Sequence, residues 1–115
     1  MKILLTGSSG LLGHAYAQAA VRRGHSVTAL YNQNKPIADG LSRTIQLDAS
    51  LPEELTNTVI ELWPDAIINC AAISNPTSVE ADAKQAEKIN IALPRLLAQL
   101  STHLGARLLL SLIHI

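Results

Sequence analysis

Thr6-Gly7-Ser8-Ser9-Gly10-Leu11-Leu12-Gly13 is the stretch of sequence that decides the fold. It follows the apolar run Lys2–Leu5, which predicts a buried strand, and it opens a helix predicted over Leu11–Arg23. A glycine-rich turn between a strand and a helix can cradle phosphate groups, because the first turn of the helix presents unpaired N–H groups and a partial positive charge. The stretch therefore predicts a dinucleotide-binding domain, with a plain tight turn as the alternative.

Each of the three glycines has a predicted task in this turn. Gly7 would let the chain turn sharply out of the strand. Gly10 would let the backbone approach a pyrophosphate, where a Cβ atom would collide with the ligand. Gly13 would let the helix pack close to the strand.

The length, charge balance and cysteine count of the chain limit the classes of protein to which it can belong. The chain has 115 residues, enough for one domain, and nine basic residues balance nine acidic ones. This balance gives no reason to expect binding to nucleic acid or to an anionic membrane surface. No apolar run approaches the ~18 residues that span a bilayer. The first strand is predicted from residue 2, which leaves no room for a signal peptide, and one cysteine permits no internal disulfide. We expect a soluble cytoplasmic protein.

Apolar runs bounded by turn residues predict five strands, which alternate with helices. The strands are expected at Lys2–Leu5, Ser26–Tyr31, Thr44–Leu47, Ala66–Cys70 and Arg107–Leu110. This alternation predicts a parallel sheet covered by helices on both faces, with right-handed crossovers. The expected fold is a Rossmann-type, doubly wound α/β sheet of order 3-2-1-4-5 that stops just after the start of strand 5. Ligands bind such sheets at the carboxyl ends of the strands.

The helices carry their own start, stop and packing signals. In the first helix, small residues such as Ala15 and Ala19 predict the face that approaches the sheet, and Gly24 is expected to end it. Ser50-Leu51-Pro52-Glu53 has the pattern of a capping box and predicts a second helix to about Leu62. A long third helix is predicted from Val79 to His103, with a buried face formed by Ile89, Leu93, Leu96, Leu97 and Leu100.

The end of the second strand bears on the choice of cofactor. A domain that prefers NAD usually has Asp or Glu there to bind the ribose 2′-hydroxyl, and Tyr31–Asn34 contains neither. Lys35 could reach a 2′-phosphate as a point charge, although an ordinary loop lysine is the alternative. The sequence therefore favours NADP over NAD as the cofactor.

Asp48-Ala49, at the end of the third strand, predicts a contact with the base of the cofactor. The carboxylate can accept a hydrogen bond from the adenine amino group, while the adjacent backbone N–H serves the ring. The alternative is that Asp48 caps the following helix. Ser50 is predicted to fill that capping role, which favours the binding role for Asp48. Cys70, which ends the fourth strand, is predicted to be a small buried residue and not a nucleophile, because no base stands beside it in the sequence.

Asn90 lies four residues before Pro94 inside the predicted third helix. Proline has no N–H, so Pro94 cannot donate to the Asn90 carbonyl, and its ring pushes that carbonyl aside. The spacing predicts a kink that releases the carbonyl from the helix ladder, where it could hold a water near the cofactor. The alternative is a kink that only fits the helix to the sheet.

Taken together, Met1 to about Leu109 resembles the N-terminal half of an extended short-chain dehydrogenase/reductase, and most closely the dTDP-4-dehydrorhamnose reductase-like subgroup. The resemblance rests on the T-G-x-x-G-x-x-G turn, Asp48, the run from Pro64 to Ala72, and Ile89-Asn90 before Pro94-Arg95-Leu96-Leu97. It implies that NAD(P) binds along three segments and that the Asn90 backbone supports a proton-relay water. The three segments are the turn (Gly7, Ser9, Gly10, Leu11, Leu12, Gly13), Asp48-Ala49, and Ala71-Ala72-Ile73.

The same resemblance implies a function. Members of the family reduce or epimerise nucleotide-linked sugars, so the first expectation is the NAD(P)-binding part of an oxidoreductase of dTDP-rhamnose biosynthesis. It would reduce a 4-keto nucleotide sugar and could form a homodimer. A nucleotide-sugar epimerase or dehydratase with tightly held NAD is one alternative. A non-catalytic subunit, similar to the regulatory subunit of methionine adenosyltransferase, is the other.

Two departures from the family pattern concern the rest of the chain. The family's catalytic Tyr-x-x-x-Lys pair should follow the fifth strand, but no Tyr follows residue 31. We therefore expect residues 1–109 to be the N-terminal part of the NAD(P)-binding domain, with no catalytic residue, no substrate-binding part and no activity alone. The last six residues look like a translation of the transposase-end adapter used in sequencing libraries, which would make 110–115 a non-native tail. Their sequence is Leu110-Ser111-Leu112-Ile113-His114-Ile115. A divergent strand end is the alternative.

Overall fold

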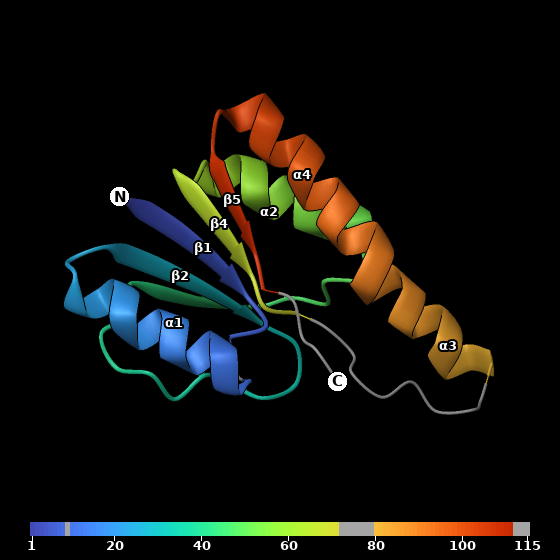
Figure 1. Ribbon diagram of the computed structural model, residues 1–115, viewed down its shortest axis with the longest axis horizontal. Coiled ribbons are helices and arrows are strands. Elements are labelled where there is room, and N and C mark those ends of the chain that lie inside the picture. The colour runs from blue at the N-terminus through green and yellow to red at the C-terminus, as the bar shows by residue number, and fades with distance from the viewer. Residues whose placement is uncertain (9, 72–79, 112–115) are drawn as a thin grey trace.

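Five parallel strands form a single sheet in the computed structural model, which describes residues 1–8, 10–71 and 80–111. The strand order is β3-β2-β1-β4-β5, so the predicted Rossmann-type topology is confirmed. All five carboxyl ends point to the same edge of the sheet (Figure 1). The strands are β1 (Lys2–Thr6), β2 (Ser26–Tyr31), β3 (Arg43–Gln46), β4 (Ala66–Asn69) and β5 (Arg107–Leu110).

Helices cover both faces of this sheet (Figure 1). Helix α1 (Leu11–Arg22) lies on one face, and α2 (Pro52–Leu62) and α4 (Leu93–Leu104) lie on the other. Strand side chains alternate between faces, so each strand feeds two apolar layers. Ile3 and Leu5 pack in the layer under α1, whereas Leu4 packs with residues of α2 and α4.

Helix α1 buries a different stripe from the predicted one. Its buried residues are Gly13, Ala17 and Ala20, whereas Ala15 and Ala19 are exposed, so that prediction is wrong. Alanines occupy both stripes, and the contact of Gly13 with the preceding turn selects which one faces inward. Gly24 ends the helix as predicted.

The predicted capping box at the start of α2 is also wrong. The residue that precedes the helix is Leu51, which has extended backbone and makes no side-chain cap. A proline favours the first helical position and forces the residue before it out of the helical region. Pro52 therefore sets the helix start one residue later than the Ser50 motif predicts. The Ser50 side chain and N–H instead both donate to Asp48.

The third predicted helix is a continuous helical run with a change of winding in the middle. Helix α3 (Glu80–Glu87) passes into a π-helical turn, η1 (Lys88–Ala92), which leads into α4. The Leu93 N–H donates to the Lys88 carbonyl, five residues back, directly before Pro94. The predicted buried face is confirmed at Ile89, Leu93, Leu97 and Leu100, and Leu96 is half-buried; Val79 lies outside the described residues.

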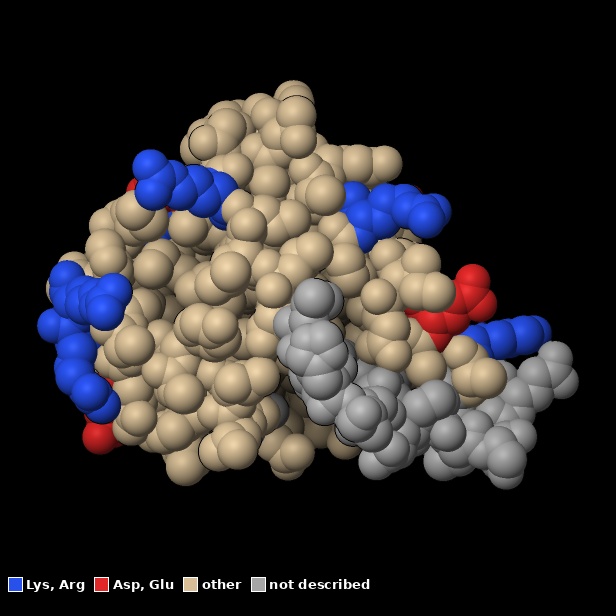
Figure 2. Space-filling view, viewed as in Figure 1, with Lys and Arg blue, Asp and Glu red and all other residues tan. Residues whose placement is uncertain are grey.

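Within residues 1–8, 10–71 and 80–111, no helix has the length and apolar character needed to cross a membrane. Figure 2 shows that Lys and Arg side chains stand at separate points around the margin of one face and form no continuous basic stripe there.

Candidate functional site

A cleft of about 420 Å³ opens at the carboxyl edge of the sheet, beside the point where the chain order reverses between β1 and β4. Ligands bind doubly wound sheets at this position. The ends of four strands and the helical run after β4 all contribute to its walls. The lining residues are Thr6, Gly7, Leu30, Tyr31, Asn32, Gln33, Asn34, Leu47, Asp48, Ala49, Ala71, Gln85 and Ile89.

Gly7 seats the glycine-rich turn directly on the end of β4. Its φ is +65°, a left-handed conformation that favours glycine. A Cβ atom there would lie 2.5 Å from both the Ala71 nitrogen and the Cys70 carbonyl carbon. Gly7 is therefore needed both for the turn and for the close approach of two backbone segments.

Gly13 closes the turn from the other side. A Cβ atom at Gly13 would lie 2.2 Å from the Gly7 carbonyl oxygen and 2.9 Å from the Ser8 Cα. Its close contact is thus with the turn itself, which corrects the prediction that Gly13 packs against the strand. Gly10 differs from both, because among the described residues a Cβ atom there would meet only the Gly7 oxygen, at 3.6 Å. The protein leaves room at Gly10, directly before the first turn of α1.

Buried hydrogen bonds fasten the turn to the neighbouring strand ends. The Ser8 hydroxyl donates to the Leu30 carbonyl at 2.9 Å, and both groups are buried. Thr6 and Asn69 face each other across the β1–β4 ladder, and the Thr6 hydroxyl donates to Asn69 Oδ1. The same oxygen accepts the Ala71 N–H at 3.2 Å. The sequence carries one signal for such bonds: a polar side chain in a buried strand needs a partner.

Asp48 lines the cleft, and its two carboxylate oxygens differ in their hydrogen bonds. Its Oδ1 accepts the Ser50 N–H at 2.9 Å and the Ser50 hydroxyl at 2.7 Å. This weakens the prediction that Ser50 relieves Asp48 of a local structural role. Oδ2 has no hydrogen-bond partner among the described residues, so it can still accept a hydrogen bond from a ligand.

The structure brings together some of the predicted site residues and separates others. Gly7, Asp48, Ala49 and Ala71 line the cleft. Five other predicted residues do not line the cleft: Gly10, Leu11, Leu12, Gly13 and Lys35. The residues from Gly10 to Gly13 continue the turn into α1. Ser9, Ala72 and Ile73 lie outside the described residues. Gln85 lines the cleft without any signal in the sequence beyond its place four residues before Ile89.

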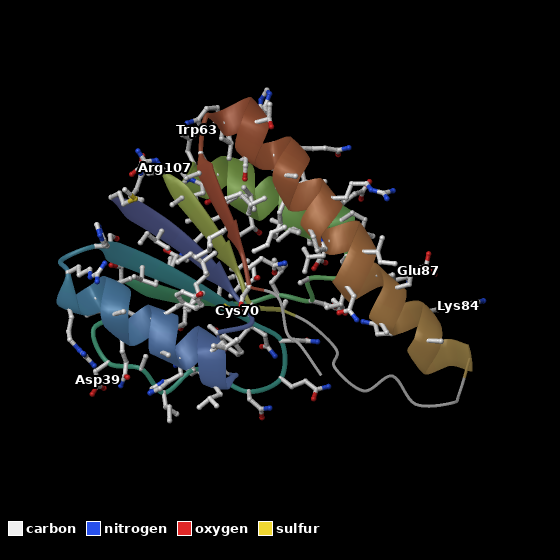
Figure 3. The ribbon with its side chains drawn as sticks, in the orientation of Figure 1. Asp39, Trp63, Cys70, Lys84, Glu87 and Arg107 are labelled. Carbon is white, nitrogen blue, oxygen red and sulfur yellow. The ribbon has the colours of Figure 1, made fainter. Side chains whose placement is uncertain are left out.

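Cys70 is half-buried at the end of β4 (Figure 3). It is not among the described residues that line the cleft. Burial raises the pKa of its thiol, and a hydrogen bond with the Ser111 side chain opposes that shift. Reactive cysteines have lowered pKa values, so this environment fits the predicted packing role. Within the described ranges no three His, Cys, Asp or Glu side chains gather as a metal site would require.

The fold and the cleft define a Rossmann-type domain of the extended short-chain dehydrogenase/reductase class. A family model described as "RmlD substrate binding domain" matches residues 1–114, and the chain belongs to this family. A dTDP-4-dehydrorhamnose reductase from Streptomyces griseus is 34% identical over 92% of the chain, which covers 31% of that protein. Methionine adenosyltransferase 2 subunit beta from Rattus norvegicus is 27% identical over 94% of the chain, which again covers 31%.

Solved structures agree with this fold. A hypothetical dTDP-4-dehydrorhamnose reductase from Sulfolobus tokodaii superposes with a TM-score of 0.79 at 26% identity, covering 96% of this chain and 38% of that one. The Bordetella bronchiseptica enzyme WbmH, solved in complex with NAD+, gives a TM-score of 0.76 at 19% identity, covering 91% and 36%. The chain therefore spans about a third of the length of the curated relatives that it matches.

Proposed function

We propose that this chain is the NAD(P)-binding portion of an oxidoreductase that reduces a 4-keto nucleotide sugar. One observation carries the proposal: Gly7 of the glycine-rich turn, Asp48-Ala49 and Ala71 line one cleft at the carboxyl edge of the sheet. The reductases among the relatives support the choice of chemistry.

In this proposal, different segments of the chain bind different parts of the cofactor. The room at Gly10 and the N–H groups that open α1 take the pyrophosphate. Asp48 Oδ2 accepts from the adenine amino group, and the Ala49 N–H serves the ring. Ala71-Ala72-Ile73 contributes to cofactor binding, and Asn90 supports a water. The bound nicotinamide would supply the hydride.

The proton donor belongs to another part of the parent protein in this proposal. The two Tyr residues of the chain, Tyr16 and Tyr31, lie in α1 and at the end of β2. We propose that a Tyr-x-x-x-Lys pair and the substrate-binding part follow in the parent. The greater length of the relatives supports this proposal.

Two alternatives keep the same cleft. An epimerase or dehydratase would hold NAD tightly, as the NAD-bound structural neighbours allow. A non-catalytic binding subunit is favoured by the similarity to methionine adenosyltransferase 2 subunit beta. A Tyr-x-x-x-Lys in the parent would exclude the non-catalytic subunit, and release of NAD on denaturation would favour the epimerase.

The test has two stages. Calorimetric titration of the chain with NADP and NAD should show binding, and Asp48→Ala should weaken it. The parent protein should then oxidise NADPH in the presence of a dTDP-4-keto-6-deoxy sugar, whereas residues 1–115 alone should not. A chain that binds neither dinucleotide would refute the proposal.

A further inference from the structure

Gln85 lines the same cleft as Gly7 of the glycine-rich turn, and it lies in α3, which follows β4. It is half-buried, and Ile89 lies one helical turn later on the same side of the helical run. Ile89 packs in the apolar layer that also contains Leu47, Ala49 and Ala71. Gln85 therefore lines the cleft together with Asp48-Ala49, one helical turn from a residue that packs in the same apolar layer as Ala49.

The Gln85 amide has no hydrogen-bond partner among residues 1–8, 10–71 and 80–111. A primary amide offers a donor and an acceptor side by side. The edge of adenine that carries N6 and N7 offers the complementary pair, and glutamine matches it with two hydrogen bonds. A carboxylate such as Asp48 can only accept, so it can serve N6–H but not N7.

We propose that Gln85 is a specificity-determining residue that recognises the N6/N7 edge of the cofactor's adenine. Asp48 and the Ala49 N–H take the opposite edge, which carries N6 and N1. The two hydrogens of the N6 amino group make this division possible, since one goes to each side. Ile89 supplies apolar surface beside the base. The inference rests on the proposed function, because it deepens the same site.

The test uses NAD+ and its 7-deazaadenine analogue, which lacks the N7 acceptor and is otherwise the same shape. The full chain should bind NAD+ about tenfold more tightly than the analogue, the range that loss of one or two hydrogen bonds gives. The Gln85→Leu variant should bind NAD+ about tenfold more weakly and should no longer distinguish the two ligands.

Gln99→Leu is the matched control, because Gln99 is exposed further along the same helical run and does not line the cleft. It should keep the discrimination of the unmodified chain. Circular dichroism melting of both variants checks that the fold is retained. A second variant, Gln85→Glu, keeps an acceptor for N6 but loses the donor to N7, so it too should fail to distinguish the ligands.

The outcomes separate this inference from the proposed function. If NAD+ binds and Gln85→Leu keeps the preference for NAD+ over the analogue, Gln85 is only part of the wall and the inference is overturned. If neither ligand binds the unmodified chain, the proposed function falls, and the inference falls with it.

Discussion

Gly10 and Gly13 stand three residues apart in one motif, yet we expect substitutions at the two positions to act differently. A side chain at Gly10 should affect ligand binding, whereas one at Gly13 should affect the stability of the fold. Gly10 has allowed extended backbone and space for a side chain, so Gly10→Val should leave the melting temperature nearly unchanged. It should abolish dinucleotide binding, because the side chain would occupy the proposed pyrophosphate position. Titration calorimetry measures the loss, and unchanged affinity would make the turn purely structural.

Gly13→Ala is the smaller change and should do more harm to the fold. Its Cβ atom would lie 2.2 Å from the Gly7 oxygen, so α1 or the turn must move. Overpacking of this kind costs about 1–3 kcal/mol, which thermal melting can detect. A Gly13→Ala chain as stable as the unmodified one would show that the helix can back away from the turn.

A substitution at Lys35 tests the predicted preference for NADP over NAD. It is exposed and lies one residue beyond the lining segment Asn32–Asn34. If Lys35 reaches the 2′-phosphate, Lys35→Glu should weaken NADP binding by about tenfold and leave NAD binding unchanged. Equal effects on both dinucleotides, or no effect on either, would remove Lys35 from the site.

Cys70 gives a prediction that follows from its pKa. Burial raises the pKa of the thiol, so the reactive thiolate is scarcer in the folded chain at pH 8 than in the unfolded chain. Iodoacetamide should therefore modify the native chain several-fold more slowly than the urea-unfolded chain, and raising the pH should speed the native reaction. Ser111→Ala should slow it further, because the Ser111 hydrogen bond lowers the pKa. Equal native and unfolded rates would show an accessible, unperturbed thiol.

At the scale of elements, the strands could be predicted to within about one residue, because each is a short apolar run between turn residues. The helix details failed where two local signals competed. Pro52 overrode the capping motif at Ser50, and two alanine stripes in α1 were indistinguishable without the contact at Gly13. Pro94 indicated a disturbance in the long helix, but its form as a π-helical turn depends on packing.

The candidate site was predictable only where a motif is local. The turn and Asp48 follow strands directly, so the topology alone brings them to one edge. The hydrogen bonds of Ser8 and Asn69 join residues 22 and 63 positions apart, and no short pattern encodes them. Gln85 enters the cleft through the path of α3, which periodicity does not fix.

The π-helical turn gives a prediction at the element scale. It inserts one extra residue before Pro94, which rotates the preceding helix by about 100° relative to α4. Pro94→Ala supplies the missing N–H, so the run should become a regular α-helix that turns Gln85 and Ile89 away from their present positions. Helical circular dichroism should be kept while NAD+ affinity falls. Unchanged affinity would show that the turn does not aim these residues.

For the whole molecule, the two outer strands of the sheet differ in how they are protected. β3 begins and ends with Arg43 and Gln46, which are exposed polar residues that discourage pairing with another chain. β5 continues its ladder with β4 as far as Leu110 and Ser111, but among the described strands it has no second neighbour. Residues 112–115 of the predicted non-native tail lie outside the described residues.

This asymmetry predicts self-association of residues 1–115 through β5. Leu109 and Leu110 are 45% and 40% exposed, and an apolar open edge is a template for strand pairing between copies. Light scattering should detect oligomers or aggregates, and Leu109→Lys should raise the monomer fraction with little loss of stability. The matched control is Leu108→Lys, which should lower the melting temperature, because the partly buried Leu108 packs against the core cluster under α2 and α4. A lysine there loses the apolar contacts of the leucine and brings a charge beside the core, whereas at Leu109 the charge faces water. A monomer at all concentrations, or oligomers that Leu109→Lys leaves unchanged, would show that β5 is not the associating edge.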